Sequence, residues 1–213
     1  MKIYYIDKDI VVCEKPYGVS SQQSGGENMI NLLSAELKKE VFPVHRLDTT
    51  TTGLIVYALN KVSAAKLSDT VSKGELSKEY YAIAHGELQP QGELNDLLYH
   101  DRIKNKSFVV GTERKGAKRA ILTYKAISSV NVDGEMLSLV KIKLITGRTH
   151  QIRVQLANIG ASLYGDGKYG ARDKGKIHLH STFLSFMHPT KKEIVSFSSV
   201  PKGGLWDSFS ISE

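Results

Sequence analysis

Hydrophobic and polar residues along most of the chain follow the spacing of β-strands. Residues 3–13 (IYYIDKDIVVC) and 54–59 (LIVYAL) are short apolar runs rich in β-branched and aromatic side chains, and 140–144 (VKIKL) alternates with a period of two. Each run predicts a strand. The turn signal Asp133-Gly134 separates the apolar runs 120–127 and 136–145, which we expect to pair antiparallel as a hairpin.

A second spacing, that of amphipathic helices, is found in three segments: 27–39, 61–72 and 149–158. In the first of them Ile30, Leu33 and Leu37 fall on one face. There is no internal repeat and no low-complexity tract, and the one shift in composition is a polar stretch at 21–28. These patterns predict fold class α+β, with a single domain over residues 1–213.

The composition of the chain indicates its location in the cell. The chain has 213 residues, of which 41% are hydrophobic, enough for an ordinary buried core. Acidic residues interrupt its first apolar stretch and no run of eighteen apolar residues exists, which argues against secretion and membrane spanning. Cys13 is the single cysteine, so an internal disulfide and a zinc site of several thiolates are excluded. We expect a buried thiol in a cytoplasmic protein.

The charge of the chain favours an anionic partner. It holds 29 Lys and Arg against 22 Asp and Glu, a net charge of +7 with a pI near 9.3. The cations gather in four clusters: 104–106 (KNK), 114–119 (RKGAKR), 172–176 (RDKGK) and 191–192 (KK). Any one cluster alone is typical of a solvated turn. Four clusters between apolar strands are better explained by a surface that contacts nucleic-acid phosphates.

Two polar segments carry the candidate chemistry. The first, 45–53 (HRLDTTTTG), places Asp48 at the start of a threonine run, where it could simply cap a turn. The second, 146–153 (TGRTHQIR), ends a strand and opens a helix with Arg148, His150 and Arg153. Cations near a helix N-terminus oppose its dipole, so a nearby anion would explain them, and Asp48 could be that anion.

These segments resemble known motifs. Residues 45–58 resemble the H-R-L-D-x-x-T-S-G-L-L signature of RluA-type pseudouridine synthases, with Thr52 where the family has serine. The resemblance continues in order through 78–86 (KEYYAIAHG), 146–157 (TGRTHQIRVQLA), 165–170 (GDGKYG) and 179–189 (LHSTFLSFMHP). Gln155 and Ser181 stand where the family usually has histidine and alanine. Five motifs in order cover nearly the whole chain.

The resemblance implies a mixed, mostly antiparallel sheet and an isomerase that turns a uridine in RNA into pseudouridine without cofactor or metal. It implies Asp48 as the essential carboxylate, Arg153 as its ion-pair partner and Tyr80 against the uracil face. Whether Asp48 attacks or deprotonates the substrate stays open. Strand alternation should point Tyr81 to the opposite face from Tyr80, as a packing residue.

The resemblance also implies the residues that bind substrate. It assigns Arg46 to filling the position that the flipped uridine leaves, because a guanidinium stacks on bases and bonds phosphates. His45, Thr149, His150 and Leu179 complete the expected substrate-binding set. For His45 a role in orienting the loop is favoured over proton transfer.

Two other classes of function remain as alternatives. One is a noncatalytic RNA-binding module, against which the spacing of Asp48, Tyr80 and Arg153 argues. The other is a metal-dependent hydrolase using His45, Asp48 and His150, whose spacing differs from that of a dedicated metal site. We expect a monomer, and the resemblance favours ribosomal RNA over transfer RNA as its substrate. Since the first strand begins close to Met1, we expect no S4-like domain before it.

Overall fold

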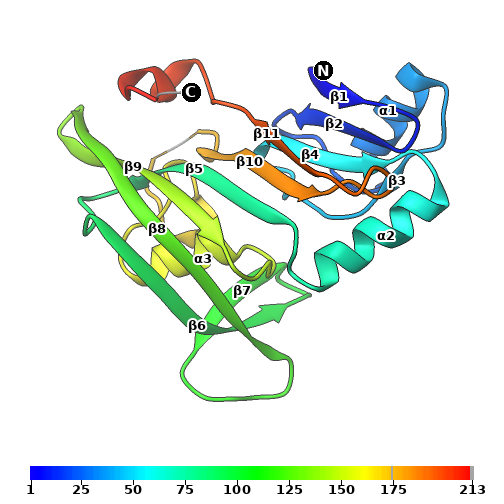
Figure 1. Cartoon of the computed structure of the whole chain (residues 1–213). Helices are drawn as coiled ribbons and strands as arrows, with labels where there is room; N and C mark the ends of the chain where they lie inside the picture. The colour runs from blue at the N-terminus through cyan, green and yellow to red at the C-terminus, as the bar shows by residue number, and fades with distance from the viewer. Residues whose placement is uncertain (174, 212–213) are drawn as a thin grey trace. The chain divides into compact units, whose positions relative to one another are not determined.

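The computed structural model describes residues 1–173 and 175–211 (Figure 1). They form two compact units, each made from separate stretches of the chain. The first unit joins Met1–Lys78 to His180–Pro201, and the second joins Glu79–Leu179 to the segment that begins at Lys202. The expectation of one domain over 1–213 stays a prediction.

The first unit is built on a mixed sheet in which the strands run in the order β1-β2-β4-β10, with β11 beside β10 and β3 beside β4. The strands are β1 (Ile3–Ile6), β2 (Ile10–Lys15), β3 (Phe42–Pro43), β4 (Thr52–Ala58), β10 (Leu179–Met187) and β11 (Ile194–Ser198). All pairs are antiparallel except β4 with β10. Ile10, Val12, Leu54 and Val56 are fully buried at its core, where Leu67 of the following helix joins them.

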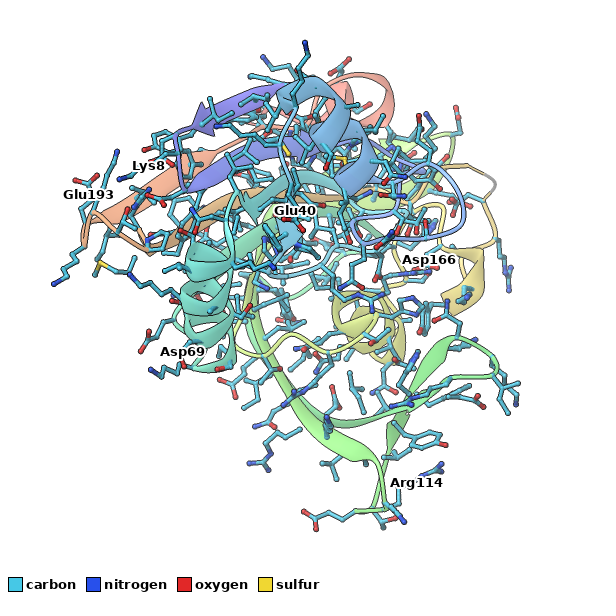
Figure 2. All side chains as sticks on the ribbon, turned by 90° about the vertical axis from the view of Figure 1, so that its right-hand side faces the viewer. Lys8, Glu40, Asp69, Arg114, Asp166 and Glu193 are labelled. Atoms are coloured by element: carbon cyan, nitrogen blue, oxygen red, sulfur yellow. The ribbon has the colours of Figure 1, made fainter. Side chains whose placement is uncertain are left out.

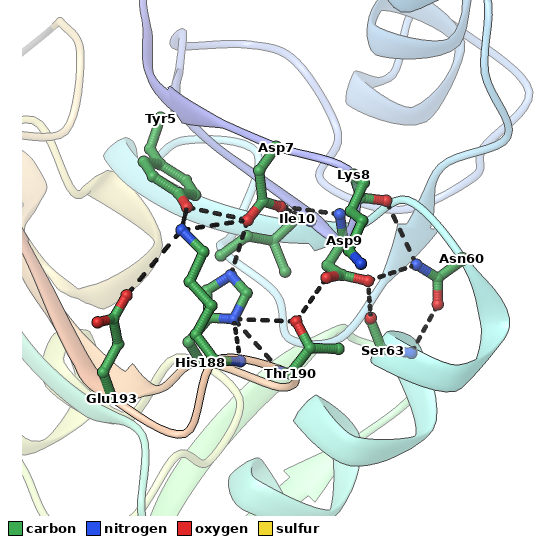
Figure 3. Close-up of polar contacts among 11 residues, drawn as sticks. Tyr5, Asp7, Lys8, Asp9, Ile10, Asn60, Ser63, His188, Thr190 and Glu193 are labelled. Carbon is green, nitrogen blue, oxygen red and sulfur yellow. Dashed lines mark hydrogen bonds and ion pairs between the residues drawn. The ribbon is translucent and has the colours of Figure 1, made fainter.

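The prediction of one strand over 3–13 is wrong, because a turn divides it into β1 and β2. Asp7 makes this turn: its Oδ1 accepts the backbone N–H groups of Asp9 and Ile10, at 2.8 and 2.9 Å. The carboxylate of Asp7 also lies 3.0 Å from Nε2 of His188, and Asp9 accepts a hydrogen bond from Thr190 (Figure 3). The turn between β1 and β2 is thereby tied to the turn between β10 and β11.

The helices are α1 (Met29–Leu37), α2 (Lys61–Ser72) and α3 (Gln151–Asn158). The predicted bounds of α2 are confirmed, and Asn60 caps it by accepting the N–H of Ser63 at 2.9 Å. The third helix begins later than predicted, because His150 has a φ of 55° and cannot be helical. None of the described helices is long and apolar enough to cross a membrane.

The second unit is an antiparallel sheet in the order β5-β9-β8-β6-β7. Its strands are β5 (Ser77–His85), β6 (Gln91–Asp101), β7 (Lys106–Val110), β8 (Ala117–Val132) and β9 (Glu135–Leu144). It also holds α3 and the short 3-10 helices η1 (Gly167–Tyr169) and η2 (Gly204–Ser208). The predicted hairpin of β8 and β9 is confirmed, with positive φ at both Asp133 and Gly134. The mixed, mostly antiparallel α+β fold class is therefore confirmed.

The two neighbouring tyrosines of β5 have different surroundings. Tyr80 is buried and lies opposite Ile142 of β9. Tyr81 packs instead against the hydrophobic cluster that includes Ile83 and Trp206. The predicted packing role of Tyr81 on the opposite face is confirmed.

Candidate active site

The loop that carries Asp48 is held by its buried residues. His45 and Leu47 are buried, whereas Arg46 is exposed and Asp48 is half-buried. Ser21 clamps the loop, because its Oγ donates to the carbonyl of Leu47 at 2.7 Å and accepts the Leu47 N–H at 3.2 Å. Alternate residues therefore anchor the loop and leave Arg46 and Asp48 at its surface.

His45 joins this loop to the sheet. Its Nε2 accepts the backbone N–H of Val56, at 3.1 Å, so the ring proton is on Nδ1. Burial, with a contribution from the nearby ammonium of Lys78, holds the pKa of His45 well below its usual value. A neutral imidazole whose unprotonated nitrogen accepts a backbone hydrogen bond is suited to orienting the loop. This is the role that the sequence favoured for His45.

A buried lysine lies under the same loop and was missed in the sequence. Lys15 is fully buried, and its Nζ donates to the carbonyl oxygens of Pro16, Val19 and Thr49 at 2.8, 2.8 and 3.2 Å. Burial lowers the pKa of Lys15 to about 8, and the charge of Asp48 opposes that shift. The feature of the sequence that could have indicated this buried lysine is its place at the end of the apolar strand β2, directly before a proline.

The threonine run ends at a position that requires glycine. Thr51 donates its N–H to the carbonyl of Asp48 at 2.9 Å, which closes the turn. Gly53 has a φ of 102°, and a Cβ there would clash with the backbone of Ser181 on β10. Thr52 lies 2.8 Å from Nδ1 of His180, whose pKa burial lowers to about 4. The loop therefore leads directly into the parallel pairing of β4 with β10.

In the second unit Arg153 makes a buried ion pair with Asp166. Its Nε and one terminal nitrogen bond the two carboxylate oxygens, at 2.6 and 2.8 Å, and both side chains are almost fully buried. The ring of Tyr169 lies 5.1 Å from the guanidinium carbon. This bidentate pair fixes the plane of the guanidinium. Asp166 was missed as a site residue, although it lies in the quoted segment 165–170.

Thr149 and His150 are held by a small network around Tyr169. The phenol oxygen of Tyr169 accepts the N–H of Ser107 at 2.8 Å and lies 2.9 Å from Nδ1 of His150. Ser107 also donates from its Oγ to the carbonyl of Thr149, at 2.6 Å. The strand β7, the helix η1 and the start of α3 are thus joined beside Arg153.

The predicted site residues divide between the two units. His45, Arg46 and Asp48 belong to the first unit. The second unit holds the remaining members: Tyr80, Thr149, His150, Arg153 and Leu179. Leu179 is buried at the first position of β10. Buried hydrogen bonds hold the loop of Asp48 in the first unit, and His150 and Arg153 in the second. The proposed pairing of Asp48 with Arg153 stays a prediction.

The histidines of the metal-hydrolase alternative have other partners. Nε2 of His45 accepts a backbone N–H, and Nδ1 of His150 bonds Tyr169. Among residues 1–173 and 175–211, no group of three or more His, Cys, Asp and Glu is placed to hold a metal ion.

The basic clusters fall mainly on connections of the second unit. Residues 104–106 lie at the turn between β6 and β7, and 114–119 lead from the loop after β7 into β8. Arg114 lies on that loop, and its guanidinium carbon is 3.6 Å from the centre of the Tyr99 ring (Figure 2). The cluster 172–176 includes Lys174, which lies outside the described residues.

Comparison with known proteins identifies the family. A family model described as RNA pseudouridylate synthase matches residues 9–158, a span that includes Asp48, Tyr80 and Arg153. The chain belongs to the RNA pseudouridylate synthase family. It is accordingly an isomerase that acts on RNA. The resemblance noted in the sequence is confirmed at the level of the family.

Curated relatives cover almost the whole chain. The tRNA pseudouridine synthase C of Vibrio vulnificus is 31% identical over 227 residues, which are 95% of this chain and 91% of that protein. The ribosomal large subunit pseudouridine synthase D of Zymomonas mobilis is 28% identical over 223 residues, covering 93% of this chain and 68% of that protein.

A solved structure shares the fold. Human RNA Pseudouridylate Synthase Domain Containing 1 has a TM-score of 0.82 with this chain at 23% identity, over 94% of this chain and 83% of that one. At this identity the likeness supports the fold alone. The α+β architecture described above is therefore the architecture of pseudouridylate synthase domains.

Proposed function

We propose that this protein converts specific uridines in structured RNA into pseudouridine by an aspartate-dependent, cofactor-free mechanism with base flipping. The observation that carries the proposal is the anchored loop of Asp48. Ser21 and His45 fix its buried residues, and Lys15 holds a positive charge beneath it. An anchored, half-buried carboxylate is the arrangement that a nucleophile or base requires.

Each proposed catalytic residue has a physical role. Asp48 acts on the sugar or the base, so that the N-glycosidic bond breaks, the base rotates and a carbon–carbon bond forms. Arg153, already oriented by Asp166, pairs with the Asp48 carboxylate and favours its charged form. Tyr80 packs against the uracil, and its phenol assists the removal of the proton from carbon that completes the product.

The first prediction tests this assignment with Asp48→Asn. Pseudouridines would be mapped in total RNA from cells with and without the gene, and the deletion should lose specific sites. The parent gene should restore them, whereas Asp48→Asn should restore none, because an amide of the same shape supplies no charge. RNA binding and thermal unfolding of the purified variant should match the parent. A variant that restores the sites would disprove the role of Asp48.

The second prediction tests base flipping with Arg46→Ala. Arg46 is exposed beside Asp48, as a side chain that fills a vacated stack must be. Under single-turnover conditions the variant should lose much of its rate on a uridine in a stem and far less on the same uridine in an unpaired strand. Arg46→Lys should rescue poorly, because an ammonium does not stack as a plane. An equal defect on both RNAs would show that Arg46 acts in another step.

The substrate proposal extends to ribosomal and transfer RNA. The resemblance to the family favoured ribosomal RNA, while one relative is named for transfer RNA and another for the large ribosomal subunit. The mapping experiment distinguishes them, since the RNA that loses a site names the substrate. We further propose that the protein acts in the cytoplasm as a monomer, which fits its single buried cysteine.

A further inference from the structure

The turn between β6 and β7 presents an isoleucine entirely to solvent. Ile103 is 98% exposed, against 71% for Ile194 and less for the other exposed large hydrophobic residues that the structure describes. Arg102 and Lys104 flank it, and both are exposed. An apolar side chain between two cations has no packing role in this chain.

The turn holds Ile103 in a defined position. Oδ1 of Asp101 accepts the N–H groups of Ile103 and Lys104, both at 3.0 Å. Lys168 of η1 donates to the carbonyl of Asn105 at 3.1 Å, which ties the other side of the turn. The exposed isoleucine is therefore presented by a turn whose backbone is fixed on both sides, so little conformational entropy remains to be lost on binding.

The same turn is linked to the residues around Arg153. Directly after it, the N–H of Ser107 donates to Tyr169 and its Oγ donates to the carbonyl of Thr149. Tyr169 in turn lies over the guanidinium of Arg153. Short hydrogen bonds therefore join the end of the turn to the segment that carries three proposed site residues: Thr149, His150 and Arg153.

We propose that Ile103 is an apolar wedge that inserts against the bases of structured substrate RNA, while Arg102 and Lys104 contact the adjacent phosphates. The proposal rests on the proposed function, since it takes RNA as the substrate. A single apolar side chain offers too little area for a stable protein interface. Between cations, it has the composition of the wedges that unstack a base step while their neighbours bind the backbone.

The experiment compares Ile103→Ala with the parent on two RNAs. One is a stem-loop that contains the target uridine, with 2-aminopurine at neighbouring stem positions. The fluorescence of 2-aminopurine rises when the base unstacks. The other is an unpaired strand of the same sequence. The single-turnover rate constant on the stem-loop should fall about tenfold, because methylene groups that become partly buried against the bases are lost. On the unpaired strand it should fall by less than about twofold. The fluorescence rise seen with the parent should be lost.

Two further variants separate the wedge from charge and from folding. Ile103→Lys adds a cation, so it should bind RNA at least as tightly as the parent but fail to raise the fluorescence. Ile194→Ala, at an exposed site on β11, should behave as the parent. Because Ile103 is almost fully exposed, thermal unfolding of all three variants should match that of the parent.

The outcomes that overturn the proposal are distinct. Parent-like activity and fluorescence for Ile103→Ala would remove the wedge, and so would an equal loss on both RNAs, which would make the turn a general binding element. If the parent formed no pseudouridine on any RNA, the proposed function would fail separately. Fluorescence titration of an RNA duplex carrying 2-aminopurine would then decide the wedge: a rise that Ile103→Ala abolishes supports it, and no rise with the parent overturns it.

Discussion

Burial shifts the pKa values of single residues at this site as much as neighbouring charges do. Full burial lowers the pKa of Lys15, because it removes water from the charged ammonium. Three hydrogen bonds to carbonyl oxygens compensate in part for that lost hydration. His45 and His180 respond to burial in the same direction and stay neutral at physiological pH. The positive charge of Lys15 lies close enough to Asp48 for the two charges to interact.

The third prediction concerns the pH dependence that Lys15 causes. Its pKa is about 8 in the folded protein and 10.5 in the unfolded chain, so between these values the folded state binds fewer protons. The free energy of unfolding of the parent, relative to Lys15→Met, should therefore rise by up to about 3 kcal/mol as the pH increases through this window. Below pH 8 the full cost of the buried charge remains.

Urea unfolding of the parent and Lys15→Met at a series of pH values from neutral to alkaline measures this difference. Lys8→Met, at an exposed position, is the matched control and should follow the parent throughout. A difference between the parent and Lys15→Met that stays constant over the window would contradict the lowered pKa.

At the scale of elements, the parallel pairing of β4 with β10 leaves no room for a larger residue at one position. The two strands come from opposite ends of the chain and pair through Thr52 with His180 and Gly53 with Ser181. They approach so closely that a side chain at position 53 has no room. The position of the Asp48 loop therefore depends on a contact between elements far apart in sequence.

The fourth prediction is that Gly53→Ala destabilises the protein by more than about 3 kcal/mol, because backbone strain and a clash with β10 add together. Gly160→Ala is the matched control: its φ is also positive, at 84°, but a Cβ there meets no atom within 4 Å. It should lose about 1 kcal/mol from strain alone. Thermal and urea unfolding would measure both, and equal losses would show that the contact with Ser181 is unimportant.

At the scale of the whole molecule, the net charge of +7 governs binding to a polyanion. Several cations are already committed to protein partners. Nζ of Lys191, for example, donates to Tyr5 at 2.7 Å and lies within 4.0 Å of both Asp7 and Glu193. Lys115, on the loop after β7, and Lys118, near the start of β8, are exposed, so phosphates can approach them.

The fifth prediction follows from this distribution of charge. The logarithm of the RNA association constant should fall with the logarithm of the salt concentration by roughly 0.7 to 0.9 units for each phosphate contacted. Replacing Lys115 and Lys118 together by Gln should reduce that slope by about one unit per lost contact. Lys191→Gln is the control and should leave the slope unchanged. A flat dependence between about 50 and 200 mM salt would mean that these lysines are only solvated.

The sequence by itself determined the class of fold and the candidate chemistry. Periodicity predicted α2 with its bounds, the hairpin of β8 and β9 and the opposite faces of Tyr80 and Tyr81, because these depend on interactions between near neighbours. The family followed from short motifs, which preserve side-chain chemistry at a fixed spacing.

Only the tertiary structure decided which groups meet across long sequence separations. It divided the run 3–13 through the backbone hydrogen bonds of Asp7, and it started α3 after the left-handed backbone of His150. It paired Arg153 with Asp166 and placed Lys15 under the loop of Asp48. The spacing of hydrophobic residues does not predict such contacts, because their energy depends on burial and on the direction of each donor and acceptor in the folded chain.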